Sequence, residues 1–229
     1  MLAWAGASAS VVAVALPFLP YIVVGIVQLV AVFAGADTLA GLTKPLLMPA
    51  LLLALLLALP TRRGETALWT SLGILFGWLG DISLTDAGVG FVIGLAFFLL
   101  GHMAYIVLFW RRMRLRRPRW WSVVYALWFL ALLALLAPHA GALLLPLAAY
   151  GLALAMLGIT SSACSPWLLA GAACFVVSDS LLGMDRFLPG FALPQVDFAI
   201  MLTYLLAQGL ICWGVVRRAR ATVPAAALA

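Results

Sequence analysis

The sequence predicts an all-α protein, a bundle of about eight transmembrane helices forming a single domain over residues 1–229. Of the 229 residues, 67% are hydrophobic and 9% are charged, whereas soluble domains average about 25% charged residues. Mean hydropathy is +1.21. Apolar stretches of about 20 residues, enough to cross a bilayer as a helix, follow one another along the chain. No polar segment is long enough for a separate soluble domain.

Breaks rich in Gly, Pro, Asp and Arg divide the chain into the predicted spans. The expected ranges are residues 10–34, 44–60, 67–84, 88–110, 120–137, 141–160, 167–183 and 196–216. In the first range, Pro17 and Pro20 could kink one helix or separate two short ones. We expect one helix, because the stretch is short for two crossings. The second span is expected to begin at Lys44, since Pro45 suits the first turn of a helix.

Arginine positions predict the orientation of the bundle. Eleven of the 12 arginines lie in three segments that share one side if all eight ranges cross: TRRGE, RRMRLRRPR and the C-terminal tail. Cytoplasmic loops are enriched in Lys and Arg, so both termini are expected in the cytoplasm. These clusters flank apolar spans, which indicates contact with membrane lipid head groups and no nucleic-acid partner. Frequent Arg and Ala suggest a multi-pass protein of a bacterial inner (plasma) membrane.

Two aspartates stand in stretches that are otherwise almost entirely apolar. Asp81 lies in LGILFGWLGDISL and Asp179 in AGAACFVVSDSLL. A carboxylate at membrane depth is unfavourable by roughly 2.5 kcal/mol or more and is usually tied to function. On the predicted topology the two aspartates reach a similar level on helices that run in the same direction. Two carboxylates sharing a low-dielectric site do not both ionise, so this pair predicts a catalytic acid and base.

Six further polar residues are candidates for binding a substrate. They are Lys44, His102, Tyr105, Ser178, Tyr204 and Gln208. The single lysine offers a compact ammonium for a phosphate or an aspartate, although it could simply reach toward the membrane surface. The spacing of the His–Tyr and Tyr–Gln pairs puts each on one helix face, where either pair could instead make an ordinary hydrogen bond between helices.

Small and metal-ligating residues complete this interpretation. Glycines at positions 73, 77 and 80 permit a neighbouring helix to approach Asp81 closely. Only two histidines and three scattered cysteines are present, so we expect neither a metal ion nor another cofactor.

The order of these residues resembles the YhhN family of membrane proteins over about residues 40–214. The resemblance rests on Lys44-Pro45, Gly80-Asp81, Gly101-His102 with Tyr105, Ser178-Asp179, and Tyr204 followed by Ala207-Gln208. Characterised members are lysoplasmalogenases, which hydrolyse the vinyl ether of a lysoplasmalogen to a fatty aldehyde and a glycerophospho head group. The resemblance implies a lysophospholipid substrate and a catalytic role for the two aspartates. It gives no oligomeric state.

The implied reaction suits two carboxylates, and two other functions stay open. Protonation of a vinyl ether at carbon gives an oxocarbenium ion that water attacks, a cation similar to that of glycosidases. An intramembrane aspartyl protease would resemble its relatives in Gly-x-Gly-Asp, but Trp78-Leu79-Gly80 precedes Asp81, and Pro-Ala-Leu at 49–51 comes before both aspartates. A proton-coupled transporter would also use buried aspartates, with a possible repeat of two four-helix halves.

Overall fold

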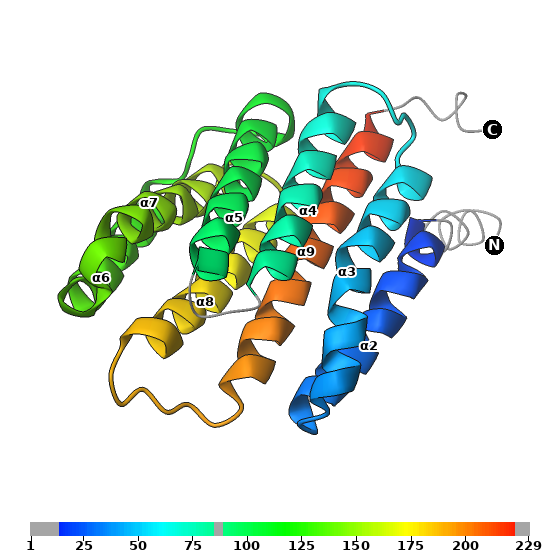
Figure 1. The fold of residues 1–229 in the computed structure, drawn as a ribbon. Coiled ribbons are helices and arrows are strands. Elements are labelled where there is room, and N and C mark those ends of the chain that lie inside the picture. The colour runs from blue at the N-terminus through cyan, green and yellow to red at the C-terminus, as the bar shows by residue number, and fades with distance from the viewer. Residues whose placement is uncertain (1–13, 85–88, 223–229) are drawn as a thin grey trace.

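A computed structural model describes residues 14–84 and 89–222 (Figure 1), and this part of the chain is helical without strands. The all-α prediction is confirmed. The elements are η1 (Leu16–Phe18), α2 (Leu19–Phe33), α3 (Asp37–Ala58), α4 (Glu65–Ser83), α5 (Val89–Leu108), η2 (Phe109–Met113), η3 (Trp120–Ser122), α6 (Val123–Ala140), η4 (Gly141–Leu143), α7 (Leu144–Ser161), α8 (Pro166–Phe187) and α9 (Val196–Ala221).

Six helical segments of the described chain are long and apolar enough to cross a membrane, which confirms a multi-pass membrane protein. They are Leu16–Phe33, Asp37–Ala58, Val89–Met113, Trp120–Ser161, Pro166–Phe187 and Val196–Ala221. The fourth contains both α6 and α7, which Gly141 separates with a φ of 52°. Helix α4, which carries Glu65 and Asp81, is not among these six segments. The count of eight crossings and the cytoplasmic termini therefore stay predictions.

The helices stand side by side, with α2 and α3 at one edge of the bundle and α6 and α7 at the other (Figure 1). Loops 59–64 and 114–119 and the end of α9 lie together at one end, which we call the arginine-rich end. Glu65 accepts hydrogen bonds there from Arg111 and Arg112, at 2.5 Å and 2.7 Å. Arg220 Nε donates to the Ala58 carbonyl over 2.8 Å. Arginines far apart in sequence thus cap the same end.

Helix α3 corrects one predicted boundary. It begins at Asp37, so Lys44 lies in the helix interior and does not open it. Prolines 45 and 49 are both inside α3. Pro49 has no N–H for the carbonyl of Pro45, four residues earlier, and Trp78 Nε1 of α4 donates to that carbonyl over 2.8 Å. A neighbouring helix supplies the missing donor, which is how membrane helices tolerate proline.

The first predicted span is one continuous helical segment over residues 16–33. Pro17 lies in the 3₁₀ turn η1 and Pro20 in the first turn of α2, where proline needs no helical donor. Residues 10–13 of the predicted range lie outside the described residues. Helix α2 is tied to α9 by Tyr21, whose hydroxyl donates to the Leu205 carbonyl over 2.7 Å.

The core lies where the central helices meet, among apolar side chains that include Leu51, Leu108, Phe175 and Ile211. The other helix boundaries agree with the sequence prediction within a few residues, although α9 continues to Ala221. Helices α4, α5, α8 and α9 stand in the middle of the bundle (Figure 1), and they carry seven of the eight predicted site residues.

Candidate active site

Asp81 is a buried carboxylate held by a tyrosine from another helix. It lies near the end of α4 and is 6% exposed. Tyr204 of α9 donates its hydroxyl hydrogen to Asp81 Oδ2 over 2.8 Å. A buried carboxylate needs such donors because it has left the hydrogen bonds of water. Tyr204 was among the residues singled out in the sequence, and the structure joins it to the first aspartate.

A chain of hydrogen bonds leads to Asp81 from the interior of the bundle. The hydroxyl of Tyr105 on α5 donates to Gln208 Oε1 over 2.6 Å. Gln208 Nε2 in turn donates to the Tyr204 hydroxyl oxygen over 3.4 Å. In each of these hydrogen bonds the donor hydrogen points along the chain toward Asp81, which is the final acceptor. Tyr105, Gln208 and Tyr204, from two helices, are therefore linked to one carboxylate.

Glycines on α4 make room for this polar chain. A Cβ atom at Gly73 would lie 2.4 Å from the ring of Tyr105. One at Gly77 would lie 2.7 Å from Gln208 Nε2 and 3.2 Å from the Tyr204 hydroxyl. These distances are shorter than van der Waals contact, so a side chain at either glycine would displace the hydrogen-bonded residues. The glycines permit the close helix approach that the sequence predicted.

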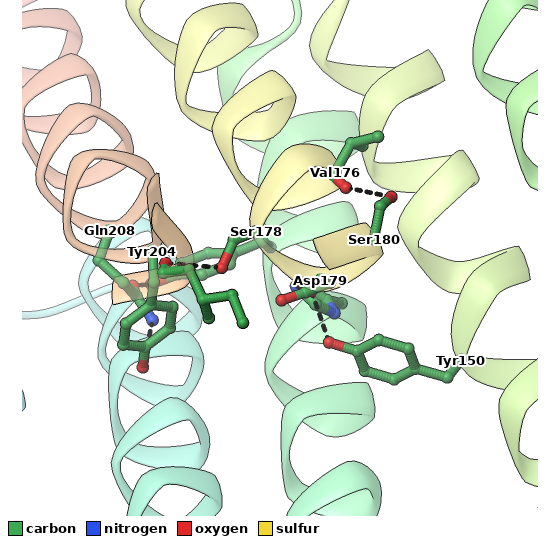
Figure 2. Close-up of polar contacts among 10 residues, drawn as sticks. Tyr150, Val176, Ser178, Asp179, Ser180, Tyr204 and Gln208 are labelled. Atoms are coloured by element: carbon green, nitrogen blue, oxygen red, sulfur yellow. Dashed lines mark hydrogen bonds and ion pairs between the residues drawn. The ribbon is translucent and has the colours of Figure 1, made fainter. Parts of the chain in front are cut away.

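Asp179 has its own tyrosine donor, from a helix that the sequence reasoning did not connect to it. Tyr150 of α7 donates to Asp179 Oδ2 over 2.6 Å, and Figure 2 shows its ring pointing from α7 toward α8. His102 Nε2 lies 3.6 Å from the same oxygen, longer than a hydrogen bond. Both contacts use Oδ2. In the described part of the chain, Oδ1 of Asp179 therefore has no protein partner.

His102 is enclosed by aromatic rings beside Asp179. Its centroid lies 5.3 Å from that of Tyr150 and 4.9 Å from that of Phe175. The histidine is 2% exposed. Its Nδ1 has no hydrogen-bond partner among the described residues. With a proton on Nε2, the imidazole faces Asp179 as a donor and leaves Nδ1 as a buried acceptor.

The two aspartates lie in adjoining settings. Within residues 14–84 and 89–222 no hydrogen bond joins them, and each is held separately by its own tyrosine. The ring of Phe175 contacts both settings, because its centroid lies 5.9 Å from that of Tyr204 and 4.9 Å from that of His102. Lys44 precedes Pro45, whose carbonyl accepts from Trp78 three residues before Asp81, so the lysine is on the Asp81 side.

An apolar groove runs past Asp179 between α6, α7 and α8. One narrow section is lined by Phe129, Leu132, Leu133, Leu136, Leu147, Tyr150, Gly151, Leu154, Asp179 and Gly183. A second section shares four of these residues and continues past Tyr125, Trp128, Ala155 and Val176. Asp179 and its tyrosine are the polar groups of the first section. Asp81 does not line this groove.

Ser178 is the predicted site residue that the structure directs elsewhere. Its hydroxyl donates to the backbone carbonyl of Ile200 over 3.0 Å, which ties α8 to α9 (Figure 2). Tyr150 was missed, although it lies about as far into α7 as Asp179 lies into α8 from the same end of the bundle. Matching the depth of the tyrosines to that of the aspartates is the signal that would have found it.

The sequence profile of the YhhN family matches residues 39–215, which include every residue of the candidate site. This chain belongs to the YhhN family. No curated protein matches the chain, and no solved structure does. The family match covers α3 to α9, so both aspartates and both tyrosine donors of this YhhN protein lie in the family region, whereas α2 precedes it.

Proposed function

We propose that this YhhN protein is a membrane-embedded hydrolase that cleaves the vinyl ether bond of lysoplasmalogens. One observation carries the proposal. Two buried carboxylates, Asp81 and Asp179, are each held by their own tyrosine on the central helices, and Asp179 lines an apolar groove. A carboxylic acid and a carboxylate together can supply the proton and the negative charge that vinyl ether hydrolysis needs. No metal or other cofactor enters the proposal.

The reaction balances with water as the only co-reactant. A protonated aspartate gives its proton to the vinyl carbon farther from the ether oxygen, and the π electrons form the new C–H bond. The ether oxygen then stabilises the neighbouring carbon as an oxocarbenium ion. Water adds to that carbon while the ionised aspartate takes a proton from it. The resulting hemiacetal collapses to a fatty aldehyde and the free hydroxyl of the glycerophospho head group.

The geometry favours Asp179 as the acid and Asp81 as the base. Asp179 lines the groove, and its Oδ1 has no partner in the described chain, so a proton there points to a ligand. Lys44 adjoins Pro45, which is hydrogen-bonded to Trp78 one turn before Asp81, and an ammonium on this side would favour the ionised form of Asp81. The same ammonium is suited to the phosphate of the head group.

Aldehyde release by the purified protein tests this function. The substrate is a lysoplasmalogen, and the comparison is a lysophospholipid with the same chain and head group but an acyl ester in place of the vinyl ether. Release of aldehyde from the first, with no hydrolysis of the second, is the expected result. Equal cleavage of both would replace the vinyl ether mechanism with esterase chemistry, and cleavage of neither would refute the proposal.

The hydrogen-bonded chain from Tyr105 to Asp81 is the observation that favours a second function, proton-coupled transport. A connected path of hydroxyl and amide groups that ends on an aspartate resembles a proton relay. Liposomes containing the protein distinguish the two functions. Lysolipid-dependent proton flux without aldehyde indicates a transporter, whereas aldehyde without flux indicates the hydrolase.

A further inference from the structure

The groove between α6, α7 and α8 has the character of a site for an aliphatic chain. Its two sections share Phe129, Leu132, Gly151 and Leu154, so they form one continuous path. The helices that border it lie in segments apolar enough to cross a membrane. In a membrane the molecules around these helices are lipid chains. One of them can enter an unfilled apolar groove without the removal of water from either surface.

The length of the groove matches one lipid leaflet. Its lining on α7 runs from Leu147 to Ala155, and eight residues of helix span about 12 Å. Half of the hydrocarbon core of a bilayer is about 15 Å. The groove begins near the turn at Gly141 and leads toward the arginine-rich end, so a chain lying in it runs from one membrane surface toward the centre of the bilayer.

Asp179 is hydrogen-bonded to Tyr150, which lies three residues from the Leu147 end of the lining on α7 and five from the Ala155 end, and Gly183 is the α8 lining residue nearer the Gly141 turn. A chain in the groove therefore passes Asp179 close to its head-group end, which is where a vinyl ether stands in a lysolipid. Groove residues Ala155 and Val176 lie farther toward the arginine-rich end and would hold the remainder of the chain.

We propose that this groove is the binding site for the one aliphatic chain of a lysophospholipid, with Asp179 against the first carbons of that chain. The choice of a lysophospholipid as the ligand rests on the proposed function. It adds a location and a direction for the chain. The α6–α7 hairpin forms one wall of the site. Gly151 lets the two helices pack closely, because a Cβ there would lie 2.8 Å from the Phe129 ring.

Photo-crosslinking with the full-length protein in nanodiscs tests the site without relying on catalysis. The probe is a lysophospholipid with a saturated ether chain that carries a diazirine near its middle, so vinyl ether chemistry does not consume it. Mass spectrometry is expected to find labels on groove residues such as Leu132 and Leu154, and unlabelled lysoplasmalogen should reduce them. Labels distributed evenly over the lipid-facing residues of all helices would overturn the proposal.

A pair of variants on α6 sharpens the test. Leu132→Trp fills the groove and is expected to reduce labelling there to the level of the other lipid-facing surfaces. Leu130→Trp is the matched control, because Leu130 is 59% exposed and does not line the groove. If Leu132→Trp fails to elute as a folded protein, Leu132→Ala replaces it and should move the label to positions deeper in the groove. Unchanged labelling in the folded groove variant would overturn the site.

The outcomes separate this site from the proposed function. Groove labelling without aldehyde release would leave the chain site standing and remove the hydrolase. Aldehyde release with labelling no stronger in the groove than on Leu130 and its lipid-facing neighbours would leave the hydrolase standing and remove the site.

Discussion

Tyr150 and Asp179 join the wall of the groove to the candidate proton donor. The 2.6 Å hydrogen bond between them connects α7 to α8, and both residues line the same apolar section. Asp81 has an equivalent bond from Tyr204, on the side of the bundle away from the groove. The two carboxylates are therefore oriented by different helices, and each can be disturbed without removing the other's donor.

Tyrosine-to-phenylalanine variants should weaken activity while leaving the fold intact. Tyr150→Phe and Tyr204→Phe each remove one hydrogen bond to a carboxylate, which predicts about a tenfold loss of kcat/KM for aldehyde release. Tyr21→Phe is the control, because Tyr21 donates to a backbone carbonyl, that of Leu205, and does not line the groove. Equal losses in all three variants would mean that the hydroxyls act on packing and not on the aspartates.

Removing either carboxyl proton carrier should have a larger effect. Asp81→Asn and Asp179→Asn are each expected to lower kcat by about 100-fold or more, the usual contribution of general acid–base catalysis. Asp197→Asn is the matched control, since Asp197 is exposed in the first turn of α9. Full aldehyde release by both site variants would show that the pair is not the catalytic machinery.

Gly77→Ala should disturb the polar chain through a single methyl group. The new Cβ would meet Gln208 Nε2 at 2.7 Å, so the amide must move and its bond to Tyr204 lengthens. We expect lower activity. We also expect a lower thermal unfolding temperature in detergent, because overpacking lowers the free energy of unfolding by roughly 1–3 kcal/mol. Gly41→Ala in α3 is the control, because nothing lies within 4 Å of its Cβ position. Identical behaviour of the two variants would contradict the close approach.

Trp78→Phe should destabilise α3 by leaving the Pro45 carbonyl without a donor. The expected loss is about 1 kcal/mol, typical of one hydrogen bond between membrane helices, measured by unfolding in detergent. Adding Pro49→Ala restores a backbone N–H four residues after Pro45 and should recover part of this loss. A second substitution that destabilises further would indicate that the prolines are needed for another reason.

Glu65 predicts a pH-dependent contribution to stability at the arginine-rich end. Desolvation opposes its charge, but the hydrogen bonds and charges of Arg111 and Arg112 outweigh it and lower the pKa of Glu65. A carboxyl whose pKa is lower in the folded than in the unfolded protein stabilises the fold at pH values above its unfolded pKa, about 4.3 for Glu. This stabilisation is lost as the pH falls through the pKa of the folded protein.

Glu65→Gln should therefore unfold at a lower temperature than the wild type at about pH 7, and the difference should shrink below about pH 4.3. The measurement is thermal unfolding in detergent across this range, with salt held constant because exposed ion pairs are screened. A difference between the two proteins that stays constant down to the lowest pH would contradict the ion pairs.

The predicted fold followed from apolar length and from Gly, Pro and Arg breaks, and it was least accurate where proline was interpreted. Pro45 suggested a helix start, yet α3 begins at Asp37 because Trp78 supplies the donor that the prolines remove. A sequence does not show which indole from another helix will reach a carbonyl. For the same reason Lys44 was placed at a helix end although it lies two turns inside.

The candidate site was predicted in part. Asp81, Tyr204, Gln208 and Tyr105 form the connected chain, because polar residues inside membrane spans must find one another. Tyr150 was passed over since a single tyrosine in an apolar helix has no spacing pattern. The groove depends on how far α6 stands from α8, a distance that no local pattern encodes.

The position of α6 and α7 at the edge of the bundle has a consequence for how the protein meets a ligand. A groove between such helices is reached by lateral diffusion in the plane of the membrane and not from bulk water. The concentration that governs binding is then the mole fraction of substrate among the lipids of the bilayer. Diluting the substrate with inert lipid at constant total substrate should slow turnover, whereas diluting the vesicles in buffer should not.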